Sequence, residues 1–391
     1  MPADTATFAS CLPTDWREAI LAGRLQTGAG PSTVCVIDGR VRDVSRLRPT
    51  VSQLLNGWDG KVPDGDDLGP LDRLPIRPAF AGGSEPRMLS PFDLHCIKAS
   101  GVTFATSALE RVIEERARGD AGRAEEIRAS LDERIGTDIR AVRPGSDAAR
   151  QLKAALIEDG LWSQYLEVAI GPDAEIFTKA PVLSSVGWGD WIGVRRDSAW
   201  NNPEPEIVLA CDGEGRILGA TLGNDVNLRD IEGRSALLLG KAKDNNASCA
   251  TGPFIRLFDR TFGLDDVRKA VVKLDITGED GFRLEGRSSM SEISRDPEDL
   301  VRQTIGPDHR YPDGFALFLG TMFAPVADRD APGLGFTHKP EDRVRVTSER
   351  LGTLENRVTT CDRASPWTFG ITDLMRNLAA RGLLTPPPRG L

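Results

Sequence analysis

Residues 201–229 read NNPEPEIVLACDGEGRILGATLGNDVNLR and carry more structural information than any other part of this chain. Two apolar segments, 206–211 and 216–223, flank the turn residues Asp-Gly-Glu-Gly and predict a β-hairpin. Glu204 and Glu206 alternate where the first strand should begin. Because side chains alternate between the two faces of a strand, these two carboxylates share one face.

Asp225 follows the second strand of this hairpin, which should return it to the side of Glu204 and Glu206. Three carboxylates without a neighbouring Cys or His are hard oxygen ligands, which suit Mg²⁺ or Mn²⁺ rather than zinc. Acidic pairs on strands are more often solvated surface, so the pattern taken alone leaves both interpretations open.

Composition excludes several classes of function. The chain has 391 residues, with 49 Lys and Arg against 58 Asp and Glu, so its formal net charge is −9. This argues against nucleic acid or an anionic membrane as the main partner. The apolar runs fall short of the roughly 20 residues that a membrane-spanning helix needs, and the start lacks a signal-peptide pattern. Six scattered cysteines without a Cys-x-x-Cys pair predict reduced thiols in a cytoplasmic protein.

The segment pattern predicts an α+β fold dominated by antiparallel or mixed sheet. We expect a small N-terminal α/β cap domain at 1–75, a linker at 76–93, a catalytic domain at 94–384 and a frayed tail at 385–391. Residues 60–75, rich in Gly, Pro and Asp, resemble a linker. The predicted helices are 15–24, 51–55, 107–134, 147–159, 296–305 and 371–381. The other predicted hairpins pair 33–37 with 41–44, 271–276 with 282–287, and 342–346 with 354–360; 94–99 is a further strand.

Several motifs together resemble the signature of the fumarylacetoacetate hydrolase superfamily over residues 94–358. They are Glu-x-Glu at 204–206, NDVNLRD at 224–230, EIFTKAP at 175–181, AK at 242–243 with SCATGP at 248–253, GT at 320–321, and LGTLEN at 351–356. The resemblance implies a mixed β-sandwich roll and a homodimer. It also implies a divalent metal, Mg²⁺ with Mn²⁺ as the alternative, held by Glu204, Glu206 and Asp225.

The resemblance also implies roles for residues around the metal. Lys243 matches the lysine that steadies the substrate's oxyanion, and Thr321 matches the threonine that contacts the substrate's carboxylate. Lys241 is a rival, because two lysines two residues apart on a strand share a face. The spacing to the Gly-Pro loop at 248–253, expected to wrap the substrate, favours Lys243. Without the resemblance, solvated lysines and a helix-end hydroxyl would be the ordinary interpretation.

One position departs from the hydrolytic members of the superfamily. They place a His and a Glu after a Gly-x-Asn-Tyr segment, whereas this chain has GVTFATS at 101–107, with Ser107 in the place of the His. This variant resembles the sugar-acid dehydratases of the superfamily. The resemblance implies magnesium-dependent conversion of 2-keto-3-deoxy-D-pentonate (xylonate or arabinonate) to 2,5-dioxopentanoate and water, in oxidative pentose degradation.

The dehydration needs a base and an acid, and we expect the paired Glu114 and Glu115 to supply them from a helix that closes as a lid. Which of the two is the base stays open, and Ser107 would orient a substrate hydroxyl. A solvated acidic face formed by Glu110 and Glu114 is the alternative interpretation. Two alternative functions share the metal site: a C–C bond hydrolase or decarboxylase acting on acylpyruvate-like β-dicarbonyls, and a non-catalytic sugar-acid binding protein.

Overall fold

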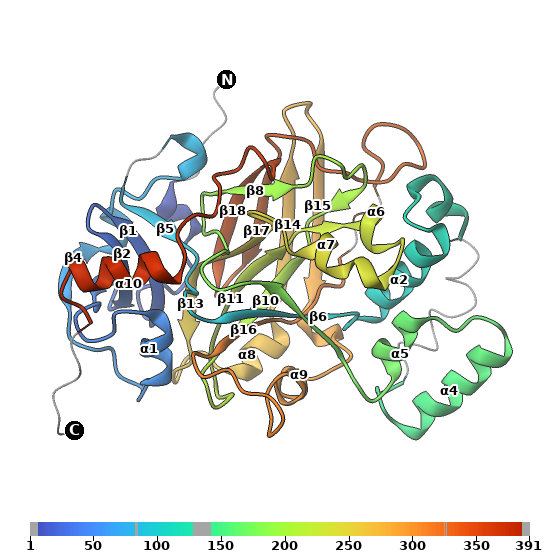
Figure 1. Cartoon of the computed structure of the whole chain (residues 1–391), viewed down its shortest axis with the longest axis horizontal. Helices are drawn as coiled ribbons and strands as arrows, with labels where there is room; N and C mark the ends of the chain where they lie inside the picture. The colour runs from blue at the N-terminus through green and yellow to red at the C-terminus, as the bar shows by residue number, and fades with distance from the viewer. Residues whose placement is uncertain (1–6, 83–84, 128–141, 324, 326, 385–391) are drawn as a thin grey trace.

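The computed structural model describes residues 7–82, 85–127, 142–323, 325 and 327–384. Within these residues, two sheets pack face to face as a sandwich (Figure 1). Most neighbouring strands are antiparallel, but β16 and β6, and likewise β18 and β8, pair in parallel. The predicted α+β class with mixed sheet is therefore confirmed.

The larger sheet contains eleven of the described strands. Their order is β4 (Asp66–Pro70), β3 (Arg40–Asp43), β2 (Gly30–Ile37), β1 (Leu21–Thr27), β13 (Cys249–Leu257), β11 (Ile217–Asp225), β10 (Pro205–Cys211), β16 (Phe315–Phe318), β6 (Cys96–Gly101) and β7 (Glu175–Ala180), with β5 (Arg87–Leu89) paired to β1. The second sheet has the order β15 (Arg283–Ser289), β14 (Val271–Thr277), β17 (Arg343–Ser348), β18 (Gly352–Thr360) and β8 (Trp191–Val194). A short pair joins β9 (Asn201–Asn202) to β12 (Asn227–Leu228).

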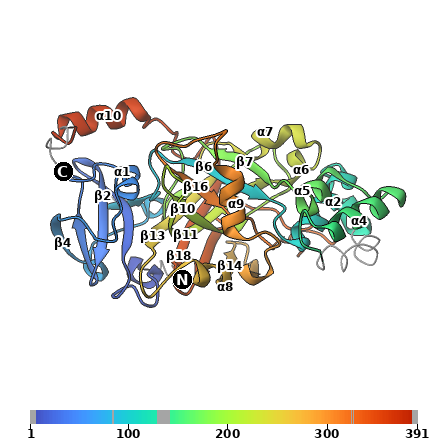
Figure 2. The same ribbon diagram turned by 90° about the horizontal axis from the view of Figure 1, so that it is seen from below.

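Helices lie around and between these strands. They are α1 (Val51–Asn56), α2 (Ala105–Ala117), α4 (Asp147–Glu158), α5 (Gln164–Ile170), α6 (Arg229–Glu232), α7 (Leu239–Lys243), α8 (Leu264–Lys269), α9 (Pro297–Thr304) and α10 (Ile371–Ala380). Figure 2 shows α10 against the N-terminal strands and α2, α4 and α5 at the opposite end of the molecule. None of the described helices is long and apolar enough to cross a membrane.

The four predicted hairpins form as expected. In the first, Asp38 and Gly39 join β2 to β3 with φ values of 51° and 68°, the left-handed conformation that tight hairpin turns require. β10 and β11 form the hairpin that carries the acidic residues, and Glu206 lies opposite Gly223. The predicted start of α9 is also confirmed, since the Asp296 side chain accepts a hydrogen bond from the backbone N–H of Glu298.

Four local predictions are wrong. Residues 21–24 belong to strand β1, whose first five residues are all buried, so no polar alternation marks it as a strand. Residues 66–70 of the linker-like stretch at 60–75 form β4, and residues 249–253 of the expected Gly-Pro loop belong to β13. The predicted helix at 107–134 ends at Ala117, because Arg118 and Gly119 adopt left-handed conformations with φ of 54° and 74°. A separate helical stretch follows at 121–127, and 128–134 lie outside the described residues.

The predicted division between an N-terminal and a catalytic domain stays a prediction. Hydrogen bonding of the larger sheet continues across it, since Leu21 on β1 pairs with Arg256 on β13. The N-terminal strands thus extend the same sheet that carries the acidic hairpin. The predicted tail at 385–391 lies outside the described residues.

Helices α2, α4 and α5 form a layer with an apolar cluster of its own, separate from the core between the two sheets. On α2 the apolar positions recur at helical spacing and point into this cluster. They are Ala108, Leu109, Val112, Ile113 and Ala117. This leaves the opposite side of α2 free to face the acidic hairpin with polar side chains.

Candidate metal and substrate site

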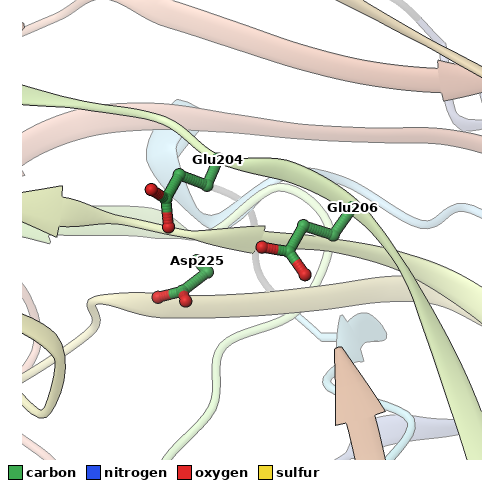
Figure 3. Close-up of side chains that lie close together, drawn as sticks. All are labelled: Glu204, Glu206 and Asp225. Carbon is green, nitrogen blue, oxygen red and sulfur yellow. The ribbon is translucent and has the colours of Figure 1, made fainter. Parts of the chain in front are cut away.

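The hairpin brings the three predicted carboxylates together. Glu204 lies just before β10, Glu206 lies on it, and Asp225 ends β11; their side chains are buried and offer oxygen atoms within 4.8 Å of one another (Figure 3). The hairpin ends are tied, since the backbone N–H of Asp225 donates to the Glu204 carbonyl over 3.0 Å. The Asn224 side chain in turn accepts from the Glu204 N–H. The strand alternation predicted from sequence is therefore confirmed.

Glu206 is oriented from a neighbouring strand end. Its Oε2 accepts a hydrogen bond from the backbone N–H of Gly320 over 2.6 Å. Gly320 has a φ of 86°, and a Cβ there would lie 2.0 Å from the Thr103 Oγ1, so this close approach requires glycine. Burial and the charges of Asp225 and Glu204 raise the pKa of Glu206 well above its usual range.

Two buried lysines offset the negative charge of these carboxylates. The Nζ of Lys179 lies 2.8 Å from one oxygen of Asp225, and the Nζ of Lys243 lies 3.1 Å from the other and also pairs with Glu204. Burial opposes ionisation of Asp225, but the two ammonium groups outweigh it and lower its pKa. A buried all-oxygen donor set of this kind fits a hard divalent cation held by Glu204, Glu206 and Asp225.

Lys243 lies beside the carboxylates because of helix α7. The expectation that Lys241 and Lys243 lie on a strand is wrong. Residues two apart on a helix point about 200° apart, so Lys243 is buried whereas Lys241 is exposed near Asp197. The Lys243 carbonyl accepts hydrogen bonds from the Lys179 ammonium and from the Ser248 hydroxyl, which holds the end of the helix.

A small cavity of about 30 Å³ opens over the acidic residues. The predicted site residues among its lining are Ser107, Glu204, Glu206, Asp225, Lys243 and Thr321. The Ser107 hydroxyl also bonds the backbone of Phe104 at the start of α2, and the Thr321 hydroxyl accepts from the N–H of Phe323. The fold thus gathers these segments, far apart in sequence, around one space. None of the described lining residues is a histidine.

Glu114 and Glu115 are not among the described residues that line this cavity. Glu114 is buried behind it, 2.6 Å from both Arg111 and Arg229. Burial opposes ionisation of Glu114, but these two guanidinium groups lower its pKa. Glu115 turns the other way and accepts from Ser163 and, over 2.8 Å, from Gln164 on α5. Their roles as acid and base stay a prediction that needs α2 to move.

The interpretation of Glu110 and Glu114 as a solvated acidic face is wrong. Both side chains are buried, and Arg229 contacts both. Arg229 in turn lies over the ring of Trp200, 4.3 Å from its centroid. Glu110 and Glu114 therefore tie α2 to α6 and do not face solvent.

Three charged lining residues are absent from the sequence prediction: Arg111, Glu175 and Glu232. Strand alternation in β7 could have identified Glu175 as a site residue, since it shares a face with Phe177 and Lys179 in the motif EIFTKAP at 175–181. Helical spacing marks Arg111, one turn after Ser107. No local pattern marks Glu232. Burial raises the pKa of Glu175, and burial together with nearby carboxylates raises that of Glu232 to about 7.

Comparisons with known proteins find similar sequences and similar folds. No family model matches the chain. It is 37% identical over 183 residues to 2-dehydro-3-deoxy-D-arabinonate dehydratase of Saccharolobus solfataricus, covering 46% of this chain and 57% of that protein. It is 32% identical over 203 residues to a protein of Haloferax volcanii named probable 2-keto-3-deoxyxylonate dehydratase, covering 52% and 66%. The match thus spans less than two thirds of either relative.

Solved structures share the fold over most of the chain. A 2-keto-3-deoxy-D-arabinonate dehydratase complexed with magnesium and 2,5-dioxopentanoate superposes with a TM-score of 0.62 at 24% identity, covering 87% of this chain and 99% of that one. A fumarylacetoacetate hydrolase from Exiguobacterium antarcticum gives 0.53 at 15% identity, covering 88% and 100%. This chain therefore shares the fold of these solved structures, and about half of its sequence is similar to the two proteins named as dehydratases.

Proposed function

We propose that this protein is a magnesium-dependent hydro-lyase that converts 2-keto-3-deoxy-D-pentonate to 2,5-dioxopentanoate and water. The observation that carries the proposal is the buried group of Glu204, Glu206 and Asp225 beside Lys243, in a cavity whose described lining holds no histidine. The names of the two sequence relatives support the substrate class.

Each part of a 2-keto acid finds a complementary group in the cavity. Glu204, Glu206 and Asp225 would hold Mg²⁺, which would supply a Lewis acid for the substrate's oxygens. The Lys243 ammonium places a second positive charge where negative charge develops on the keto oxygen when C3 loses a proton. The Thr321 hydroxyl would contact the carboxylate.

Dehydration requires that a base removes a proton from C3 and that an acid protonates the departing C4 hydroxyl. The pentonate loses one water, and tautomerisation through C5 leaves the aldehyde of 2,5-dioxopentanoate. Glu175 lines the cavity and has a raised pKa, which suits a group that accepts and returns a proton. Glu114 and Glu115 remain the candidates for the second group, and Ser107 would orient a substrate hydroxyl.

A direct assay tests the proposal. Purified protein is incubated with Mg²⁺ and 2-keto-3-deoxy-D-pentonate, and NMR follows the appearance of the aldehyde of 2,5-dioxopentanoate. We expect product only with the metal, and none after chelation or with Asp225→Ala. Release of pyruvate or CO₂ from acylpyruvates, with no turnover of the pentonate, would favour the hydrolase or decarboxylase alternative. Stoichiometric binding without turnover would favour a binding protein.

We further propose that the protein works as a homodimer in oxidative pentose degradation. The dimer is an implication of the superfamily resemblance, and the pathway follows from the proposed substrate. Light scattering of the purified chain measures the oligomeric state. Growth of a deletion strain on D-xylose or D-arabinose tests the role in pentose degradation.

A further inference from the structure

Helix α2 meets the acidic hairpin and α6 through charged side chains. Its apolar face packs into the separate cluster with α4 and α5, to which the body of the protein adds Val102 and Trp200. On the other face, Arg111 and Glu114 form ion pairs with the hairpin and α6. The same helix carries Ser107 to the cavity lining. Docking of α2 therefore depends on the charges of the site as well as on apolar burial.

Arg111 is the residue of α2 that contacts a carboxylate of the candidate metal site. Its Nη2 lies 2.8 Å from Oε1 of Glu204, while Lys243 pairs with Oε2 of the same carboxylate. Its Nη1 lies 2.6 Å from Glu114 and 2.8 Å from Glu232. These two carboxylates offset the guanidinium charge, so Arg111 acts on Glu204 chiefly by fixing its orientation, with Oε2 against the Lys243 ammonium that also contacts Asp225.

We propose that Arg111 is a positioning residue that couples the docking of helix α2 to divalent-cation binding at Glu204. The inference rests on the metal-binding part of the proposed function and not on its substrate. When α2 is docked, Arg111 holds Glu204 in the orientation that a cation requires. Because coupling between two equilibria is reciprocal, a bound cation must stabilise the docked helix by the same factor. Metal loading thereby brings Ser107 and Arg111 to the cavity before substrate enters.

Two measurements without substrate test this coupling. Calorimetry measures the affinity for Mg²⁺, and hydrogen exchange measures protection of the amides of 105–117 with and without Mg²⁺. Arg111→Lys keeps a positive charge but loses the two-pronged guanidinium, and Arg111→Met removes the charge. Arg116→Met, on the same helix but outside the cavity lining, is the matched control.

We expect Mg²⁺ to raise protection of 105–117 in the wild type. Both Arg111 variants should bind Mg²⁺ about 10–100-fold more weakly, as when a group that orients a metal ligand is lost. Both should also lose the metal-induced rise in protection, whereas Arg116→Met keeps both properties. A merely structural role would lower protection equally with and without Mg²⁺ and leave the rise intact.

Either of two results would overturn the coupling. One is an unchanged Mg²⁺ affinity in Arg111→Lys; the other is amide protection of 105–117 in the wild type that is the same with and without Mg²⁺. If Arg111→Met fails to fold, Arg111→Lys decides the question alone. Neither measurement involves turnover, so a protein that dehydrates the pentonate without this coupling contradicts only the inference. A protein that shows the coupling but does not turn over contradicts only the proposed function.

Discussion

Replacing Lys243 with methionine keeps most of the side-chain length but removes the ammonium group that lies against Glu204 and 3.1 Å from Asp225. Burial opposes the charge of Lys243, but the surrounding carboxylates outweigh it and raise its pKa, so the lysine is charged at neutral pH. Lys241→Met is a matched control, since Lys241 belongs to the same short helix and is exposed.

The effect on stability follows from burial of the pair. Removing one partner of a buried ion pair costs about 3–5 kcal/mol, because the other charge is left uncompensated. Lys179 still contacts Asp225 at 2.8 Å, so we expect Lys243→Met to lose about 3 kcal/mol of the free energy of unfolding without metal. Saturating Mg²⁺ supplies positive charge to the same carboxylates and should reduce this loss. The exposed Lys241 should change stability by less than about 0.5 kcal/mol.

The effect on turnover should survive metal addition. Loss of one preorganised donor at a developing oxyanion lowers turnover by about 10²–10³. The assays are denaturant unfolding with and without Mg²⁺, and steady-state rates on 2-keto-3-deoxy-D-pentonate at saturating Mg²⁺. Equal rates for the Lys241→Met and Lys243→Met variants, or a larger loss at Lys241, would refute the assignment. A stability loss that Mg²⁺ leaves unchanged would refute the electrostatic reasoning.

Three further results are expected. Glu204→Ala and Asp225→Ala should abolish Mg²⁺ binding measured by calorimetry, while circular dichroism still reports a folded protein; full activity after exhaustive chelation would contradict the metal site. Glu175→Gln should lower turnover by about 10²–10⁴ with Mg²⁺ affinity retained; unchanged turnover would exclude Glu175 from the proton transfers. Burial raises the pKa of Glu114, but two arginines outweigh it and lower the pKa overall, so the stability it adds is present above its unfolded pKa of about 4.3 and lost as pH falls through the lower folded value. The difference in unfolding free energy between wild type and Glu114→Gln should therefore be largest near pH 7 and shrink in acid; a constant difference would contradict the pairing.

Local patterns were sufficient for the acidic centre of this site. Glu204, Glu206 and Asp225 come together because strand alternation and a hairpin are short-range properties of one 29-residue stretch. The same holds for the Asp38-Gly39 turn, since both residues tolerate positive φ. The choice of Lys243 over Lys241 came from motif spacing, although the strand assumed for it is a helix.

Tertiary packing decided what local patterns leave undetermined. Strand β1 is buried on both faces and so loses the alternation that distinguishes a strand. The sequence does not reveal that Arg111 forms an ion pair with Glu204. The two residues are 93 positions apart, and a charged side chain of either kind is ordinarily exposed to solvent. Likewise, the sequence leaves Glu114 as a candidate for catalysis, whereas in the fold its carboxylate pairs with Arg229. The partner of a charged side chain depends on which elements the apolar core brings side by side, and that arrangement belongs to the whole fold.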